Sequence, residues 1–171
     1  MSKPPWQIAL TDQLEALQST GRQPRIAVIG IGNELMGDDA AGVVTVRQLS
    51  PLLEEVPHVC IIDGGGAPEN HTGRLRELPP DLVILVDAAQ LDAAPGTIQW
   101  LAWEATSGLS ASTHTMPPYM LAKYLIQEFN CSVGLLGIQP AQVGVDLPIS
   151  PPVSHAVGTL VQVLQQELSN F

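Results

Sequence analysis

The stretch RIAVIGIGNELMGDDAAG, residues 25–42, decides the fold class of this chain. Residues 25–31 form an almost continuous apolar run, which is typical of a strand that is buried on both faces of a sheet. A loop rich in glycines and acids follows, and the pattern predicts a helix from about Asp39 to Leu52. A buried strand that leads through a short loop into a helix is the opening unit of an α/β domain.

Strands and helices alternate along the rest of the chain. Residues 97–103 alternate between apolar and polar side chains more than the other runs do, which indicates an edge strand or a reversed strand. We therefore predict a three-layer α/β/α domain with a largely parallel sheet. The other predicted elements are strands at 59–63, 82–88 and 132–138 and helices at about 117–129 and 151–168.

Residues 1–24 are predicted to be an N-terminal extension of a single domain that spans residues 25–171. Asp12 and Glu15 have the spacing of a capping box, and leucines follow at helical spacing, so a short helix is expected there. A chain of 171 residues suits one domain with a sizeable core.

The charge balance excludes some classes of partner. A formal net charge of −10 argues against nucleic acid and against an anionic membrane, and favours a basic protein surface or a cation. Cys60 lies in an apolar run and is expected to be a buried, unreactive thiol, and Cys131 forms no CxxC pair with it. No signal-peptide core and no run of about 18 apolar residues is present. We therefore expect a soluble, cytoplasmic protein.

The glycines of the opening loop suggest a phosphate-binding turn, but the spacing fails. A dinucleotide fingerprint needs a third glycine where this chain has Leu35. A P-loop fits Gly32 and Gly37, but Asp38 and Asp39 stand where the lysine and the hydroxyl residue belong. Carboxylates beside a phosphate repel it, so nucleotide binding is disfavoured.

The acidic residues of the strand ends are better candidates. In a parallel sheet, ligands bind beyond the carboxyl ends of the strands. Asp38 and Asp39 follow the first strand, and Asp87 ends what should be a central strand. His114 lies among small polar residues between the fourth strand and the next helix. We single out these side chains as the candidate site.

Each candidate also has a structural interpretation. Asp38 or Asp39 could be an N-cap of the helix, for which Asp is among the best residues. Asp87 could cap a neighbouring turn, and His114 could be an ordinary loop histidine that makes a hydrogen bond, as we expect for the other three histidines. Those three are His58, His71 and His155.

Two carboxylates and an imidazole can do two kinds of chemistry. They form an open metal site of oxygen and nitrogen donors that leaves positions for substrate or water. They can also act as general acid and base in a hydrolysis. The residues alone therefore predict a hydrolase and leave its substrate undetermined.

The chain resembles the [NiFe]-hydrogenase maturation endopeptidases. Five motifs occur in the order of that family and are spread over nearly the whole chain after residue 24. Three of them, DGGGAPEN at 63–70, H-x-M-P at 114–117 and LGIQP at 136–140, most resemble one branch of the family. That branch serves the hydrogenase of formate hydrogenlyase and related membrane-bound hydrogenases. The motifs are GIGNELMGDDAAG at 30–42, IDGGGAPEN at 62–70, VDA at 86–88, STHTMP at 112–117 and LGIQP at 136–140.

The resemblance implies a specific activity. Members of this family remove a short C-terminal extension from the precursor of the hydrogenase large subunit after nickel has been inserted. By the resemblance, Asp39, Asp87 and His114 contact the metal and are the catalytic residues, by an aspartic-type or metal-assisted mechanism. Nickel is expected to arrive with the precursor rather than as a resident cofactor. The resemblance also implies a five-stranded twisted sheet with one antiparallel strand.

Within the opening loop, the resemblance assigns Asp39 to the metal and leaves Asp38 as the cap of the helix. Gly30 and Gly32 are expected to let the backbone turn tightly off the first strand. Glu34 has no counterpart in the inferred triad. Ala40 departs from the family, which commonly has glycine there, and this is harmless if Ala40 lies in the first helical turn.

Two other functions fit some of the same features. A nickel-dependent chaperone that grips the precursor without cutting it would use the same binding residues. A nucleotide-binding α/β enzyme is the less favoured alternative. We expect a monomer whose partner is the large-subunit precursor, with no nucleic acid and no membrane as partner.

Overall fold

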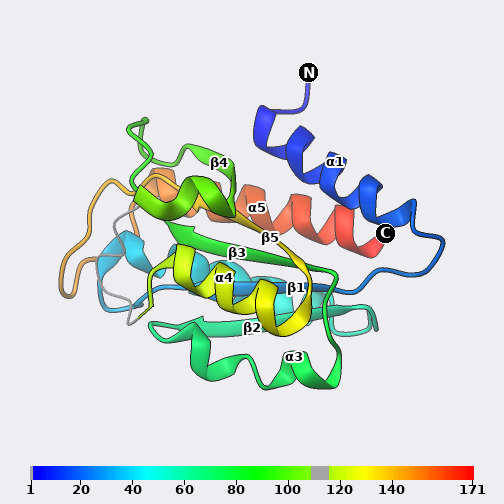
Figure 1. The fold of residues 1–171 in the computed structure, drawn as a ribbon. Coiled ribbons are helices and arrows are strands. Elements are labelled where there is room, and N and C mark those ends of the chain that lie inside the picture. Colours follow the sequence, from blue (N-terminus) through cyan, green and yellow to red (C-terminus); the bar gives the residue numbers. More distant parts are fainter. Residues whose placement is uncertain (1, 109–115) are drawn as a thin grey trace.

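The computed structural model describes residues 2–108 and 116–171. A five-stranded sheet with the order β2-β1-β3-β5-β4 forms its centre (Figure 1). The first four of these strands run parallel, and β4 pairs with β5 in the antiparallel sense. This confirms the predicted mostly parallel sheet, with the segment at 97–103 as its reversed edge strand. The strands are β1 Ile26–Ile31, β2 Val59–Gly65, β3 Leu82–Ala88, β4 Ile98–Ala102 and β5 Ser132–Ile138.

The helices lie close to their predicted positions. The helix expected from about Asp39 to Leu52 is an α-helix with a 3-10 turn at each end. The α-helices are α1 Pro5–Gln18, α2 Ala41–Leu49, α3 Arg74–Glu77, α4 Pro118–Phe129 and α5 Pro151–Ser169. The 3-10 helices are η1 Gly37–Ala40, η2 Ser50–Leu52, η3 Pro68–His71 and η4 Trp103–Gly108. None of the helices in the described residues is both long and apolar enough to cross a membrane.

Two apolar cores lie on opposite faces of the sheet. One core joins alternate residues of β1 and β3, such as Val28 and Ile84, to α1, α2 and α5. The other joins the intervening residues, such as Ile29 and Leu85, to α3 and α4. Figure 1 shows α4 on the near side of the sheet and α5 on the far side. Because both faces are covered, β1 and most of β3 are buried along their length, as their apolar runs predict.

The N-terminal helix differs from its prediction. It begins at Pro5, so Asp12 lies in its middle and the predicted capping box is wrong. Proline suits the first turn of a helix because the first N–H groups have no intrahelical acceptor there. Trp6, Leu10 and Leu14 are buried in the same core as α5, so α1 covers the far face of the sheet.

Neither cysteine is bonded to another. Both thiols are free, and Cys60 is half-buried rather than buried as expected. Burial raises the pKa of the Cys60 thiol and raises that of Cys131 to about 11. A raised pKa keeps the thiol protonated at neutral pH, which agrees with the prediction of an unreactive Cys60.

Candidate functional site

The turn after β1 places Asp39 at the carboxyl edge of the sheet. Gly32 has a φ of +146°, and a Cβ there would lie 1.8 Å from the carbonyl oxygen of Asp39. The chain can therefore fold back on itself only because residue 32 has no side chain. The Asp39 carboxylate accepts a hydrogen bond of 3.0 Å from the N–H of Asn33, which fixes it across the same turn.

Helix α2 then presses directly on the ends of β1 and β3. A Cβ on Gly42 would lie 2.1 Å from the carbonyl oxygen of Val86, and a Cβ on Gly30 would lie 2.3 Å from that of Gly42. The expected role of Gly30 is therefore wrong, because this residue permits close helix packing and the turn depends on Gly32. Ala40 has helical angles of φ −70° and ψ −12°, so the departure from glycine is harmless, as predicted.

Asp87 comes to the same edge from β3. It is opposite Gly137 of β5, so it lies on a central strand as predicted. Val86, the residue before it, is the last residue of β3 that pairs with β1. The turn η1, which carries Asp39, contacts β3. The close packing of α2 thus brings the two predicted carboxylates to neighbouring strand ends.

Both carboxylates are removed from bulk water, since Asp39 is 2% exposed and Asp87 is 3% exposed. A buried carboxylate is costly unless hydrogen bonds, a cation or a metal compensates its charge. Carboxylate oxygens held on two rigid elements are donors that a metal ion can bind. Within residues 2–108 and 116–171, no three His, Cys, Asp or Glu side chains are grouped so that they could hold a metal. The third predicted ligand, His114, lies outside the described residues.

Asp38 bonds to the loop between β5 and α5 and has a different role. Its carboxylate is fully buried and accepts hydrogen bonds from the N–H groups of Ala141, Gln142 and Ser150 at 2.8, 2.9 and 2.6 Å. The Ser150 hydroxyl donates a fourth bond of 2.8 Å. Asp38 is thus structural as expected, but it anchors the loop between β5 and α5 instead of capping its own helix.

These donors also set the charge state of Asp38. Burial alone would raise the pKa of its carboxyl group, but the hydrogen bonds from Ser150, Gln142 and Ala141 outweigh burial and lower the pKa below the ordinary value. Asp38 therefore carries a negative charge at neutral pH, although no arginine or lysine supplies any of these four hydrogen bonds.

Gln139 is a site-building residue that the sequence did not single out. Its side-chain oxygen accepts hydrogen bonds from the N–H groups of Leu91 and Ala93, and its amide donates to Gln90 at 3.2 Å. These bonds fix the loop that follows Asp87. Its place in the motif LGIQP was the available signal, but nothing local indicated a contact with residues nearly 50 positions earlier.

Glu34 is part of an ion-pair cluster on the outside of the same turn. Arg47 on α2 pairs with Glu34 and with Asp63 at the end of β2, the latter at 2.6 Å. Pairing with Arg47 gives Glu34 a structural role in this turn. It also ties the turn after β1 to the end of β2.

Comparison with known proteins identifies similar chains. A family model described as hydrogenase maturation protease matches residues 43–167. A putative hydrogenase maturation protease of Methanocaldococcus jannaschii is 31% identical over 152 residues, which are 83% of this chain and 89% of the relative. The hydrogenase 3 maturation protease of Escherichia coli is 34% identical over 139 residues, covering 79% of this chain and 85% of that protein.

Solved structures agree with these matches. The crystal structure of a [NiFe] hydrogenase maturation protease from Thermococcus kodakarensis superposes with a TM-score of 0.79 at 30% identity. The superposition covers 91% of this chain and 99% of that one.

Proposed function

This chain belongs to the hydrogenase maturation protease family, and we propose that it is an endopeptidase acting on the large-subunit precursor of a [NiFe] hydrogenase. In this proposal it removes the C-terminal extension of a precursor that already holds nickel. The observation that carries the proposal is the pair of buried carboxylates, Asp39 and Asp87, fixed on separate elements at adjoining strand ends.

Nickel enters as part of the substrate. Asp39 and Asp87 offer oxygen donors to a metal that the precursor's own ligands hold, and His114 is proposed as the third contact. Contact with the metal would align the scissile bond with the two carboxylates, so a precursor without nickel would bind poorly and stay uncut. The backbone bond from Asn33 to Asp39 keeps one carboxylate oriented before substrate arrives.

The cleavage adds one water molecule across an amide bond. The water oxygen bonds to the carbonyl carbon, the C–N bond breaks, and a proton moves to the leaving nitrogen. Asp39 and Asp87 are the groups of this chain that can take the proton from water and pass it on. A rate that follows the titration of one carboxylate would assign an aspartic-type mechanism, and a rate that depends on the identity of the metal would assign activation to the metal.

Mass spectrometry of the precursor tests the function. Nickel-loaded precursor incubated with this protein should lose the mass of its C-terminal peptide, and nickel-free precursor should keep it. Stable binding with unchanged mass would instead identify a non-cutting chaperone, which uses the same residues. A precursor that neither binds nor changes mass would refute both.

The proposal also covers where and in what form the enzyme works. We place it in the cytoplasm as a monomer, in keeping with its two free thiols, which suit a reducing compartment. Light scattering at working concentration, with and without precursor, tests the monomer and the stoichiometry of the complex.

A further inference from the structure

An apolar surface lies on two loops beside the candidate site. Most of the exposed large hydrophobic side chains in the described residues are on these loops, and Val145 and Leu35 are 71% and 62% exposed. Monomeric proteins seldom expose such clusters without a binding role. We call this cluster the apolar platform, and its members are Leu35, Val143, Val145 and Leu147.

The two loops of the apolar platform are cross-linked by their backbones. The N–H of Asp146 donates to the carbonyl of Leu35 at 2.8 Å, and the N–H of Asp38 donates to the carbonyl of Gln142 at 2.9 Å. The Asp38 carboxylate adds its bonds to the same loop. The platform is therefore a prebuilt surface, and a partner that binds it would not have to order the loops first.

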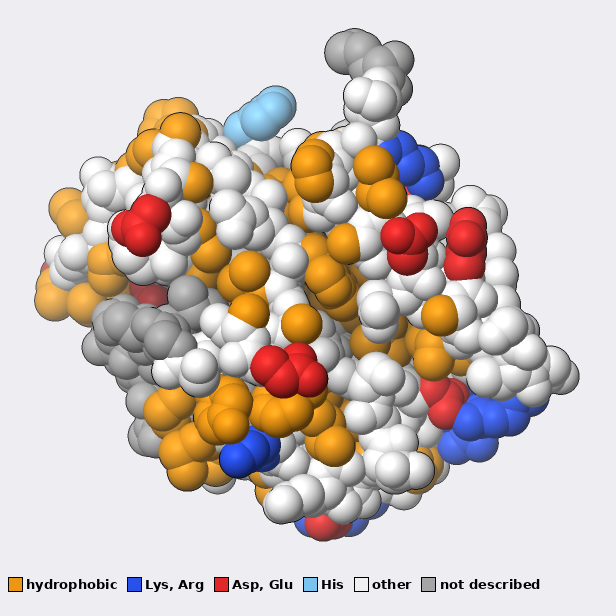
Figure 2. Space-filling model, turned by 45° about the horizontal axis from the view of Figure 1, so that its top comes forward, with side chains coloured by type: hydrophobic (Ala, Val, Ile, Leu, Met, Phe, Trp, Pro, Cys, Tyr) orange, Lys and Arg blue, Asp and Glu red, His pale blue; other side chains and the backbone are white. Residues whose placement is uncertain are grey.

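The apolar platform adjoins the carboxylates. Leu35 precedes Asp39 within one tight turn, whose fold depends on Gly32. Figure 1 shows the β5–α5 loop, in orange, beyond the carboxyl ends of the strands, and Figure 2 shows hydrophobic side chains gathered at this edge of the molecule. The platform and the two carboxylates therefore lie at the same edge of the sheet.

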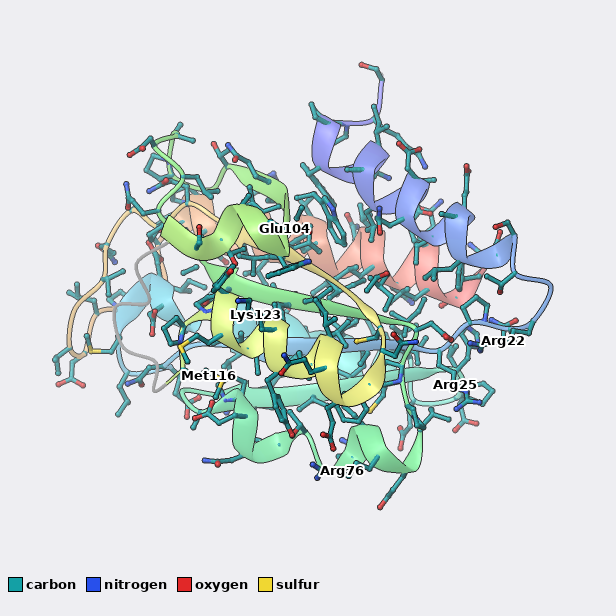
Figure 3. The ribbon with its side chains drawn as sticks, in the orientation of Figure 1. Arg22, Arg25, Arg76, Glu104, Met116 and Lys123 are labelled. Atoms are coloured by element: carbon teal, nitrogen blue, oxygen red, sulfur yellow. The ribbon has the colours of Figure 1, made fainter. Side chains whose placement is uncertain are left out.

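The loops at this edge carry acids, two of which, Glu34 and Asp63, pair with Arg47 of α2. The stretches 32–40, 63–73, 87–97 and 139–150 contain Asp and Glu but no Lys or Arg. Of the basic residues labelled in Figure 3, Arg22 and Arg25 lie at the opposite end of the strands, Arg76 is on α3 and Lys123 is on α4. Asp92 and Asp146 are exposed acids of these loops and form the acidic rim of this edge. Such a rim beside an apolar surface complements a segment that combines apolar side chains with Lys or Arg.

We propose that the apolar platform docks the part of the hydrogenase precursor next to the scissile bond, and that this part is an apolar segment interspersed with basic residues. The proposal rests on the function proposed above. Apolar side chains of the segment cover Val145 and Leu35, and its cations face the acidic rim. The platform then supplies affinity, while Asp39 and Asp87 act on the bond that it presents.

The test compares binding and cleavage of nickel-loaded precursor by wild type and by the double variant Leu35→Asp/Val145→Asp. Both side chains are exposed, so the variant should fold, which circular dichroism and urea unfolding verify. We expect Kd and KM to rise roughly tenfold or more, with kcat within about twofold. Ile8→Asp on α1, also at an exposed hydrophobic residue, is the matched control and should change neither.

A separate variant tests the contribution of the acidic rim to docking. Asp146 has a φ of 56°, a conformation that asparagine tolerates, so Asp146→Asn removes charge without strain. We expect a smaller rise in Kd and a weaker dependence of Kd on salt.

The possible outcomes test the docking proposal separately from the proposed function. Wild type that cuts precursor, with a double variant of unchanged Kd and KM, would overturn the platform and leave the function standing. Wild type that neither binds nor cuts would overturn both. A double variant that loses only self-association, seen by light scattering, would show that the platform serves a second copy and would overturn this proposal.

Discussion

Asp81 at the amino end of the sheet and Asp38 at its carboxyl end are stabilised in different ways. At the amino end, Asp81 pairs with the Arg22 guanidinium and accepts a hydrogen bond of 2.8 Å from the N–H of Arg25. At the carboxyl end, Asp38 is satisfied by neutral backbone N–H groups and one hydroxyl. Asp81 is thus neutralised by a cation, whereas Asp38 keeps its negative charge among neutral donors, although Glu34 and Asp63 on the outside of the same edge pair with Arg47.

The pKa values at the two ends fall for different reasons. Burial would raise the pKa of Asp81, but its bonds to Arg22 and Arg25 outweigh burial and lower it. The pKa of Asp38 is lowered by backbone and hydroxyl donors alone. The pKa values of Asp81 and Asp38 are thus both lowered, but Asp81 forms a structural ion pair with a cation, whereas Asp38 keeps its charge beside the candidate site.

The largest expected effect comes from the carboxylates at the catalytic edge. Asp87→Asn should reduce cleavage of nickel-loaded precursor by about a thousandfold or more, because a donor to the metal and a proton carrier is lost. Asp39→Asn should behave alike. Initial rates followed by mass spectrometry measure this loss.

Asp92→Asn is the matched control for these variants. Asp92 is an exposed acid in the loop after Asp87, and its positive φ of 52° is tolerated by asparagine. Cleavage by this control should be unchanged. Wild-type rates in both Asp39→Asn and Asp87→Asn would refute the site.

Asp38→Asn should weaken the fold rather than the chemistry. An asparagine cannot accept all four hydrogen bonds, and its amide would face backbone N–H groups, so the free energy of unfolding should fall by about 3 kcal/mol. Ser150→Ala removes just the hydroxyl bond and should cost about 1 kcal/mol. Urea unfolding measures both, with exposed Asp12→Asn as the control. Equal stability of wild type and Asp38→Asn would contradict the anchor.

The loss of stability at acidic pH tests the role of Asp38 in a second way. Because the folded-state pKa of Asp38 lies below its ordinary value of 3.8, its stabilisation is present above that value. It is lost as the pH falls through the folded-state pKa. Wild type should therefore lose stability more steeply than Asp38→Asn below about pH 4. Parallel curves from urea unfolding at several pH values would argue against a buried, charged Asp38.

The smallest effect is expected at the amino end. Arg22→Ala removes an exposed ion pair, while Asp81 keeps its bond to the backbone of Arg25. Surface pairs contribute little and are screened by salt. The melting temperature should barely change at low salt and not at all at high salt. A large drop in the melting temperature would mean that the Arg22–Asp81 pair stabilises the amino end as strongly as Asp38 stabilises the carboxyl end.

The sequence determined the sheet well because its strands are local patterns. The run at 82–88 is apolar because both faces of β3 are covered, and the alternation at 97–103 indicates the edge strand β4. The geometry of a parallel sheet also placed Asp87 and the pair Asp38 and Asp39 at one edge, because the carboxyl ends of their strands meet there. The choice of Asp39 over Asp38 for the proposed site came from the family resemblance.

Two of the errors and omissions involve partners distant in sequence. Asp38 was expected to cap its own helix, because a local rule cannot foresee donors in a loop more than 100 positions away. Gln139 was missed for the same reason. The start of α1 at Pro5 is different, because a proline in the first helical turn is itself a local signal, which the prediction passed over in favour of Asp12.

The bond between Asp38 and Ser150 has a consequence for how the protein is made. It joins residues 112 positions apart, so it closes one of the longer loops of the chain. Contacts of such separation carry a large loop-closure entropy and form late. On a ribosome, the turn that carries Asp39 emerges early but lacks its support until α5 begins to leave the exit tunnel. The turn that carries Asp39 therefore gains this support only after the chain has grown by the 112 positions that separate Asp38 from Ser150.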